Sequence, residues 1–277
     1  MTFLGTATQS LELVAETDAH EGPVYVADED ALYFTTVRGD AVAIKRLALA
    51  DGSVSVVCAD ANMANGMALD LEGRLVVCEQ GTLDTPARIT RLDRRTGRVE
   101  TIVEANLNSP NDVVVKGDGT IWFTDPSYGY LQGFRPVPQR GDDVYRYDPD
   151  AGELTVVAEG FDKPNGIAFS PDERVLYVAD NGAPHELLAF DVENGGLTNR
   201  RRLAVSTPEH PDGLKTDAEG RIYASYAGGV QVLDPSGGVI GEIELPGAVN
   251  FTFGGPERDV LYITADTAVW AVFLKGA

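Results

Sequence analysis

The chain has 277 residues, a hydrophobic fraction of 43% and a formal net charge of −21, from 43 acidic and 22 basic residues. This acidity argues against nucleic acid or an anionic membrane as a partner, because both require a basic surface. No apolar run approaches the roughly 20 residues needed to cross a bilayer, and the N-terminal segment lacks the basic start of a signal peptide. The cytoplasm is therefore the expected location. The two cysteines, Cys58 and Cys78, lie in apolar runs and are expected to be free thiols.

Taken in chain order, the sequence consists of short apolar runs separated by turn residues. The first such runs lie near residues 22–27, 31–37, 41–49 and 53–58. Four runs of this kind are what a four-stranded antiparallel sheet requires. The same succession continues along the chain, with turns such as GDG (117–119) and PSGG (235–238), and no stretch shows a helical period. The sequence therefore predicts an all-β fold.

One motif occurs six times. Each copy opens on a residue that carries a side-chain oxygen, runs through alternating apolar positions, turns sharply and continues into a second apolar run. The copies begin at Glu21, Asn65, Asn111, Asn165, Asp212 and Asn250. Their starts lie 38 to 54 residues apart, and a period of roughly 40–50 residues built from strand pairs indicates a β-propeller. We therefore predict one domain over residues 1–277, a six-bladed β-propeller with four-stranded antiparallel blades.

The last blade has too few strands of its own. After Asn250 only three apolar runs remain before the chain ends. The missing outer strand is available near the N-terminus, where residues 10–16 alternate between apolar and polar. We expect this strand to complete the last blade and close the ring, because closure removes exposed sheet edges.

The repeated oxygen-bearing residue suggests a metal site. In a propeller the first strand of each blade lines the central channel, so these residues are expected to form a ring near one mouth. Carboxylate and amide oxygens suit Ca²⁺, Mg²⁺ or Mn²⁺, and Glu21 and Asp212 would balance one divalent cation. The alternative is that Asn-Gly and Asp-Gly pairs mark turns. That alternative does not predict the same register in six repeats, and the pattern alone leaves both interpretations open.

Four stretches resemble the SMP-30/gluconolactonase family of regucalcin-like lactonases, in its bacterial gluconolactonase branch. They are HEGPVY, NSPNDVVVKGDGTIWFTD, FDKPNGIAFSPDERVLYVAD and HPDGLKTDAEGRIYAS, and the resemblance extends over essentially the whole chain. It implies one divalent metal ion in the channel, with Ca²⁺ as the first expectation and Zn²⁺, Mn²⁺, Mg²⁺ or Fe²⁺ as alternatives. By motif match it implies Glu21, Asn165 and Asp212 as the metal ligands and Asn111 as a residue close to metal and substrate.

The resemblance also implies a reaction, the hydrolysis of a sugar lactone to its aldonic acid. A bound cation can polarise the lactone carbonyl and stabilise the oxyanion that develops when water attacks. Asp212 is the candidate general base toward that water, and water activated directly by the metal ion is the alternative. Ser109 stands where the regucalcin branch has an arginine, which leaves the sugar specificity open.

The long connection over residues 126–143 is the second candidate part of the site. Long loops in compact domains often serve as lids or binding loops, and a solvent-exposed excursion is the alternative. Low-ranking candidates for substrate contacts are Tyr128, Phe134, Arg135, Asp180 and His210.

The sequence contains no motif for a nucleotide, a flavin or a covalent nucleophile. The favoured function is a metal-dependent lactonase that acts on a small-molecule lactone. The alternatives are a phosphotriesterase-like hydrolase that uses the same metal site and a non-catalytic ligand-binding propeller. The oligomeric state is left open.

Overall fold

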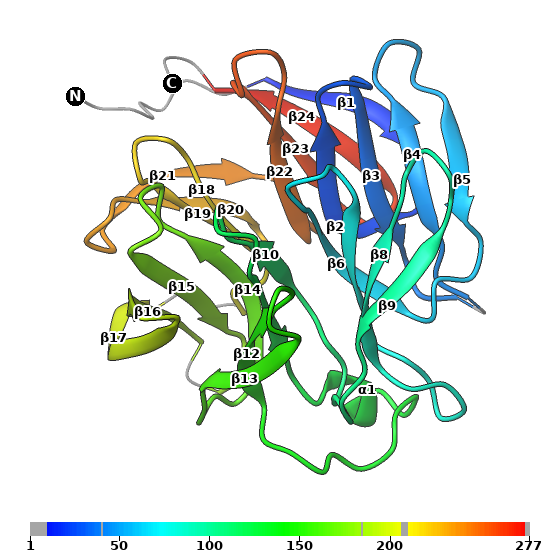
Figure 1. Cartoon of the computed structure of the whole chain (residues 1–277). Helices are drawn as coiled ribbons and strands as arrows, with labels where there is room; N and C mark the ends of the chain where they lie inside the picture. The colour runs from blue at the N-terminus through cyan, green and yellow to red at the C-terminus, as the bar shows by residue number, and fades with distance from the viewer. Residues whose placement is uncertain (1–9, 40, 184, 206–209, 275–277) are drawn as a thin grey trace.

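The structure is a computed structural model that describes residues 10–39, 41–183, 185–205 and 210–274. Its strands form six four-stranded sheets, arranged in a ring as the blades of a β-propeller (Figure 1). The predicted six-bladed all-β fold is therefore confirmed. Residues 1–9, part of the segment in which no signal peptide was expected, lie outside the described residues.

The first three blades each use four consecutive strands. Blade 1 consists of β2 (Ala19–Val26), β3 (Ala31–Thr36), β4 (Ile44–Ala48) and β5 (Val54–Cys58). Blade 2 consists of β6 (Ala64–Leu69), β7 (Leu75–Glu79), β8 (Arg88–Leu92) and β9 (Val99–Val103). Blade 3 consists of β10 (Val113–Val115), β11 (Ile121–Asp125), β12 (Asp143–Asp148) and β13 (Glu153–Ala158).

The remaining three blades continue this order until the last. Blade 4 consists of β14 (Pro164–Phe169), β15 (Val175–Asp180), β16 (Glu186–Glu193) and β17 (Gly196–Val205). Blade 5 consists of β18 (Leu214–Thr216), β19 (Ile222–Tyr226), β20 (Gly229–Leu233) and β21 (Val239–Glu244). Blade 6 consists of β22 (Asn250–Gly254), β23 (Val260–Thr264), β24 (Ala268–Phe273) and β1 (Leu11–Glu16).

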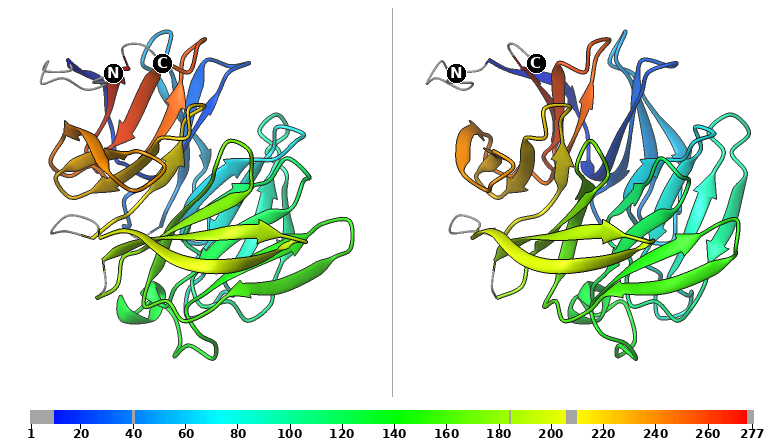
Figure 2. Two further views of the ribbon diagram at one scale, coloured as in Figure 1. Left: turned by 90° about the vertical axis from the view of Figure 1, so that its left-hand side faces the viewer. Right: turned by 60° about the vertical axis from the view of Figure 1, so that its left-hand side comes forward.

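The ring is closed by the N-terminal strand, as the sequence predicted. β1 runs antiparallel to β24, with Leu11 opposite Val272 and Glu16 opposite Ala268. The dark-blue β1 lies beside the red β24 in Figures 1 and 2. The last blade therefore joins the first and last strands of the chain, and the outer edge of β24 is covered.

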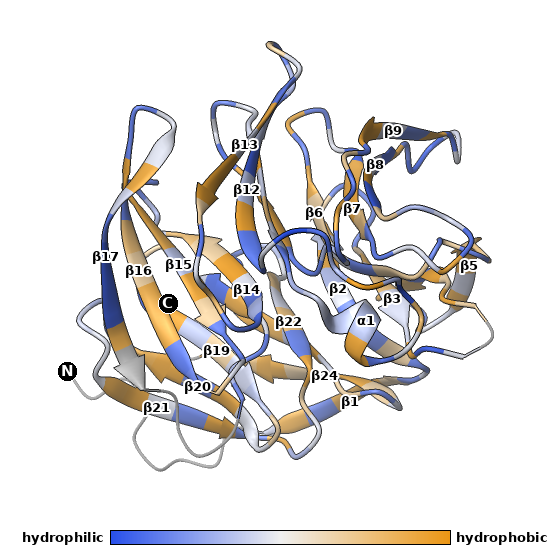
Figure 3. Ribbon diagram, turned by 90° about the horizontal axis from the view of Figure 1, so that it is seen from below, coloured by the Kyte–Doolittle hydropathy of each residue, from blue (hydrophilic) through white to orange (hydrophobic). Residues whose placement is uncertain are grey.

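The core consists of six apolar clusters, each between two consecutive blades. Between blades 3 and 4, for example, the fully buried Trp122 packs edge-on against Phe169, with ring centres 5.4 Å apart. In Figure 3 hydrophobic residues lie along the strands, and a hydrophilic stretch lies on β17, the outermost strand of its blade. Cys78 is buried, Cys58 is half-buried, and both are free, as expected.

The long connection between β11 and β12 is not structureless. It contains α1 (Tyr128–Leu131), a single helical turn that the sequence analysis did not predict because four residues are too few to show a period. Ser109 anchors this turn, since its hydroxyl donates to Pro126 O at 2.6 Å and accepts from Gly129 N at 2.9 Å. Among the described residues, no helix is long and apolar enough to span a membrane.

Candidate active site

The ring residues are the oxygen-bearing residues that open the six repeats, and three of them occupy irregular positions in the innermost strands. Asn111 and Asp212 lie just before β10 and β18. In β14 the pairing register shifts between Pro164 and Ile167, on either side of Asn165. β2 and β6 have similar irregularities around Glu21 and Asn65. A β-bulge changes the direction of the side chain it contains, and such bulges are common beside active sites. These irregularities turn oxygen-bearing side chains into the channel.

The glycine after a ring residue contacts the neighbouring blade. Gly166 N donates to Asp212 O at 3.0 Å, and Gly66 N donates to Asn111 O at 2.7 Å. A Cβ atom at either glycine would clash with the carbonyl oxygen that its own amide contacts. Both glycines lie inside strands, β14 and β6, so these Asn-Gly pairs do not mark turns. Each glycine makes a close contact with the next blade, and these contacts hold successive ring residues at one height.

Five of the six ring residues line one cavity of about 220 Å³. They are Glu21, Asn65, Asn111, Asn165 and Asp212. The sixth, Asn250, is buried behind Glu21 and donates from its amide to Glu21 Oε2 at 2.8 Å. The residues assigned to the metal site from the sequence therefore lie together, and their role as ligands stays a prediction.

Two carboxyl groups share this buried site. Burial raises the pKa of Glu21, and the charge of Asp112 adds to that rise, whereas His20 and the Asn250 amide lower it. Burial, followed by repulsion from Glu21, raises the pKa of Asp212 well above its usual range. Like charges in one desolvated site disfavour joint ionisation unless a cation lies near them. The electrostatics of the site therefore favour a bound cation.

The hydrogen bonding of the site also fits a metal ion. The Oδ1 atoms of Asn65, Asn111 and Asp212 are buried and have no hydrogen-bond donor among the described residues. A buried polar atom without a partner is costly and rare, and a bound ion is one recognised explanation. Within the described part of the chain, no group of three or more His, Cys, Asp or Glu side chains is placed to hold a metal. The candidate metal site is not such a group, because it has only two carboxylates and its other oxygens come from asparagine amides.

Tyr128, on α1, lines the same cavity. Its hydroxyl accepts a hydrogen bond of 3.4 Å from Asn165 Nδ2. Burial, and then the charge of Asp212, raises the pKa of Tyr128, so its phenol stays protonated at neutral pH. Of the predicted substrate contacts, Tyr128 is the one that the structure places in the wall of the cavity.

Arg135 and Phe134 lie outside the cavity wall. The Arg135 guanidinium donates to four backbone carbonyls, those of Asn108, Thr82, Thr85 and Leu107, at 2.7 to 3.1 Å. These bonds tie the long connection to the loops of blades 2 and 3. The Arg135 guanidinium is therefore engaged by backbone carbonyls, and its contact with substrate stays a prediction.

Asp180 and His210 also lie outside the cavity wall. The Asp180 carboxylate accepts from the backbone amides of Asp162 and Lys163 at 3.0 and 2.7 Å, which orders the segment before β14. His210 Nδ1 lies 3.0 Å from Asn181 O, and Asn181 does line the cavity.

Two charged residues at or beside the cavity, Arg38 and Asp112, were not predicted from the sequence. Arg38 lines the cavity, donates to Gln132 Oε1 at 3.2 Å, and has its guanidinium 5.0 Å from the centre of the Phe134 ring. It lies outside the repeated motif and the quoted family stretches, so no signal in the sequence identified it. Asp112 occupies the position after a ring residue, which is glycine in four of the six copies, and that exception was a detectable signal.

Known proteins resemble this chain in sequence and in overall fold. The family model described as SMP-30/Gluconolactonase/LRE-like region matches residues 19–267. A gluconolactonase of Xanthomonas campestris with a solved structure is 36% identical, with a TM-score of 0.86 over 95% of this chain and 89% of its own. The gluconolactonase of Zymomonas mobilis is 29% identical over 99% of this chain and 83% of its own length. Pentonolactonase XacC of Haloferax volcanii is 29% identical over 88% of this chain and 80% of its own. The chain belongs to the SMP-30/gluconolactonase/LRE-like family.

Proposed function

We propose that this protein is a metal-dependent hydrolase that opens sugar lactones to aldonic acids. The observation that carries the proposal is the set of three buried, unpaired oxygens, from Asn65, Asn111 and Asp212, around one cavity. The lactone as substrate class is supported by the gluconolactonases and the pentonolactonase that resemble this chain over most of its length.

Glu21, Asn165 and Asp212 would hold the metal ion, with Asn111 beside it. Ca²⁺ is the expected ion because every donor is a carboxylate or amide oxygen. When bound, such a cation polarises the lactone carbonyl and stabilises the negative charge that develops on its oxygen.

The protein's own residues supply the proton transfer. Asp212 Oδ1 has no donor among the described residues, so it is available to accept a proton from the attacking water. The water oxygen then bonds to the carbonyl carbon, and the ring C–O bond breaks. The proton passes to the released alkoxide, so that water is added across the ester bond. The protonated Tyr128 hydroxyl, in a residue that lines the cavity, would donate a hydrogen bond to a substrate oxygen.

Lactone hydrolysis after metal removal tests this proposal. Acid release from glucono-1,5-lactone and other aldonolactones is followed after EDTA treatment and after Ca²⁺, Mn²⁺ or Zn²⁺ is restored. We expect EDTA to abolish the activity and one of these ions to restore it. Asp212→Ala and Glu21→Ala are expected to be inactive with an unchanged β circular dichroism spectrum. Full activity in demetallated protein would contradict the proposal, and a fluorophosphate substrate tests the phosphotriesterase alternative.

A further inference from the structure

A third carboxylate lies in the channel wall beneath the candidate metal site. Asp112 follows the ring residue Asn111 and is 2% exposed. It lines neither the site cavity nor a second cavity of about 960 Å³ formed by the other ends of the innermost strands. Asp112 lies between the two mouths, because Asn111 before it lines the site cavity and Val113 after it lines the second cavity. Asp112 directly follows Asn111, whose side chain lines the site cavity, so the Asp112 charge lies close to the candidate metal site.

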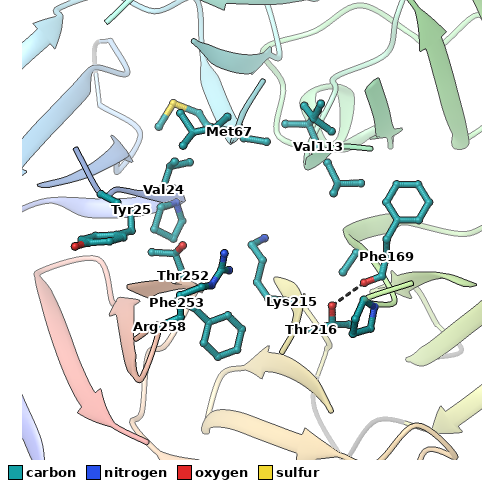
Figure 4. A pocket seen from close by; sticks show the side chains of 18 of the residues that line it. Val24, Tyr25, Met67, Val113, Phe169, Lys215, Thr216, Thr252, Phe253 and Arg258 are labelled. Carbon is teal, nitrogen blue, oxygen red and sulfur yellow. Dashed lines mark hydrogen bonds between the residues drawn. The ribbon is translucent and has the colours of Figure 1, made fainter. Parts of the chain in front are cut away.

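The partner of Asp112 comes from the opposite mouth. Lys215 lies three residues after Asp212, and Figure 4 shows its side chain extending into the middle of the second cavity. Most of the residues around it are apolar, including Val24, Met67 and Val113. The Lys215 ammonium lies 3.7 Å from Asp112 Oδ2, an oxygen that has no hydrogen-bond donor among the described residues. The two groups form an ion pair across the floor of the site.

We propose that Lys215 is the built-in counter-charge of the candidate metal centre: by balancing Asp112, it sets how tightly the site holds a divalent cation. The proposal rests on the metal binding proposed above. Glu21, Asp112 and Asp212 together carry three negative charges when ionised, and Lys215 offsets one. Arg38 also lines the cavity, but it is exposed, so water screens its charge. Two uncompensated charges therefore remain among the buried carboxylates, which matches one divalent ion. Lys215 is thus a positioning residue that acts through Asp112.

The proposal predicts opposite effects for the two partners of the ion pair. Lys215→Met leaves three uncompensated carboxylates, so the metal-free protein should be less stable and should bind Ca²⁺ more tightly. Asp112→Asn leaves an unbalanced ammonium beneath the site, so Ca²⁺ should bind more weakly. Because a unit charge acts on a divalent ion with twice the Coulomb energy that it has on a monovalent ion, each change in Kd should be about tenfold or more. The double variant should return to within about threefold of the wild-type Kd, because both charges are gone.

Calorimetric titration of EDTA-treated protein with CaCl₂, together with melting temperatures in EDTA, measures these effects. Lys116→Met is the matched control, because Lys116 has a similar side-chain exposure but pairs with Asp118 and Glu173 away from the site. Its Kd should stay within about twofold of wild type. A lysine with a merely structural role would give weaker binding in Lys215→Met that the double variant does not restore.

Two results would overturn the inference. The first is an unchanged or weaker Ca²⁺ affinity in Lys215→Met. The second is a double variant whose change in melting temperature in EDTA equals the sum of the changes in the two single variants. That result would show that the two charges are not coupled. A wild-type protein that binds no divalent cation would instead refute the proposed metal dependence, and the role of Lys215 in affinity with it. Even then, the melting temperatures in EDTA would report separately on the ion pair.

Discussion

Glu21 and Glu79 form a matched pair of buried glutamates with opposite surroundings. Each is 4% exposed. Glu79 is compensated, since it accepts from Arg88 Nε at 2.6 Å and from Thr90 Oγ1 at 2.8 Å. Glu21 has an amide donor in Asn250 but lies beside other carboxylates. Neutralising each with glutamine is therefore expected to change the stability of the metal-free protein in opposite directions.

The size of the effect follows from the charges involved. Two like charges roughly 4 to 8 Å apart repel by about 2–4 kcal/mol at an effective dielectric constant near 20. Glutamine keeps an oxygen for the Asn250 amide, so most of that relief should remain in Glu21→Gln, about 1–3 kcal/mol. For a chain of this size it corresponds to a rise in melting temperature of roughly 2–10 °C. Glu79→Gln should instead lower the free energy of unfolding by about 1–3 kcal/mol, because it removes the carboxylate that pairs with the half-buried Arg88.

Thermal unfolding in EDTA, followed by circular dichroism, measures both changes. The same samples are assayed for lactone hydrolysis with Ca²⁺ restored. We expect Glu21→Gln to be more stable than wild type and inactive, whereas Glu79→Gln should be less stable and active at low temperature. A Glu21→Gln protein that melts below wild type in EDTA would refute the electrostatic account. One that keeps full metal-dependent activity would refute the assignment of Glu21 as a ligand.

Four further predictions concern other parts of the structure. Gly166→Ala should lower the free energy of unfolding by about 1–3 kcal/mol and reduce activity, because the new methyl group meets the carbonyl of Asp212; wild-type melting would contradict the close contact. Removing residues 1–16 takes β1 from β24 and should lower the melting temperature of the whole chain; a fragment that melts like the intact protein would contradict ring closure. Burial raises the pKa of Asp125 to about 7, so the folded protein favours the protonated carboxyl. The stability that this carboxyl contributes is complete below the pKa of the unfolded carboxyl and is lost as pH rises through 7. In urea titrations, Asp125→Asn should remove up to about 1.4 kcal/mol per pH unit from the decline in stability between pH 5 and 7, and an unchanged slope would contradict this assignment. Arg38→Ala should raise KM for the lactone about three- to tenfold with kcat nearly unchanged, and an unchanged KM would exclude a binding role.

The fold was predictable because the signal is repeated. Six copies of one strand pair give a period that no single strand provides, and the shortage of strands after Asn250 indicated that residues 10–16 complete the last blade. The helical turn α1 was not predictable in this way, because it occurs once and is too short for a periodic pattern. Its position depends on Ser109, whose partners lie up to 20 residues away in the sequence.

The candidate site was predictable where it follows the repeat. The register of the repeat brought Asn111, Asn165 and Asp212 to one cavity. Charge type alone could not reveal the surroundings of Arg135, whose guanidinium is held by carbonyls of residues 27 to 53 positions away. Sequence chemistry identifies groups that can bind a substrate, but it does not show which of them the fold already engages. The two arginines differ in their surroundings. Arg135 donates to four backbone carbonyls, whereas Arg38 lines the cavity.

The departures from the repeat indicate how a symmetric ring produces an asymmetric site. Four of the six ring positions carry asparagine, which supplies oxygen without charge, and the glycines that follow four of the six ring residues fix the height of the ring. The charges sit at the exceptions, with Glu21 and Asp212 in the ring and Asp112 in a position otherwise taken mainly by glycine. A ring made only of asparagine would have the same geometry but no charge to retain a divalent ion against water. The regular positions therefore build the cavity, and the irregular ones give it the electrostatic character that its proposed chemistry requires.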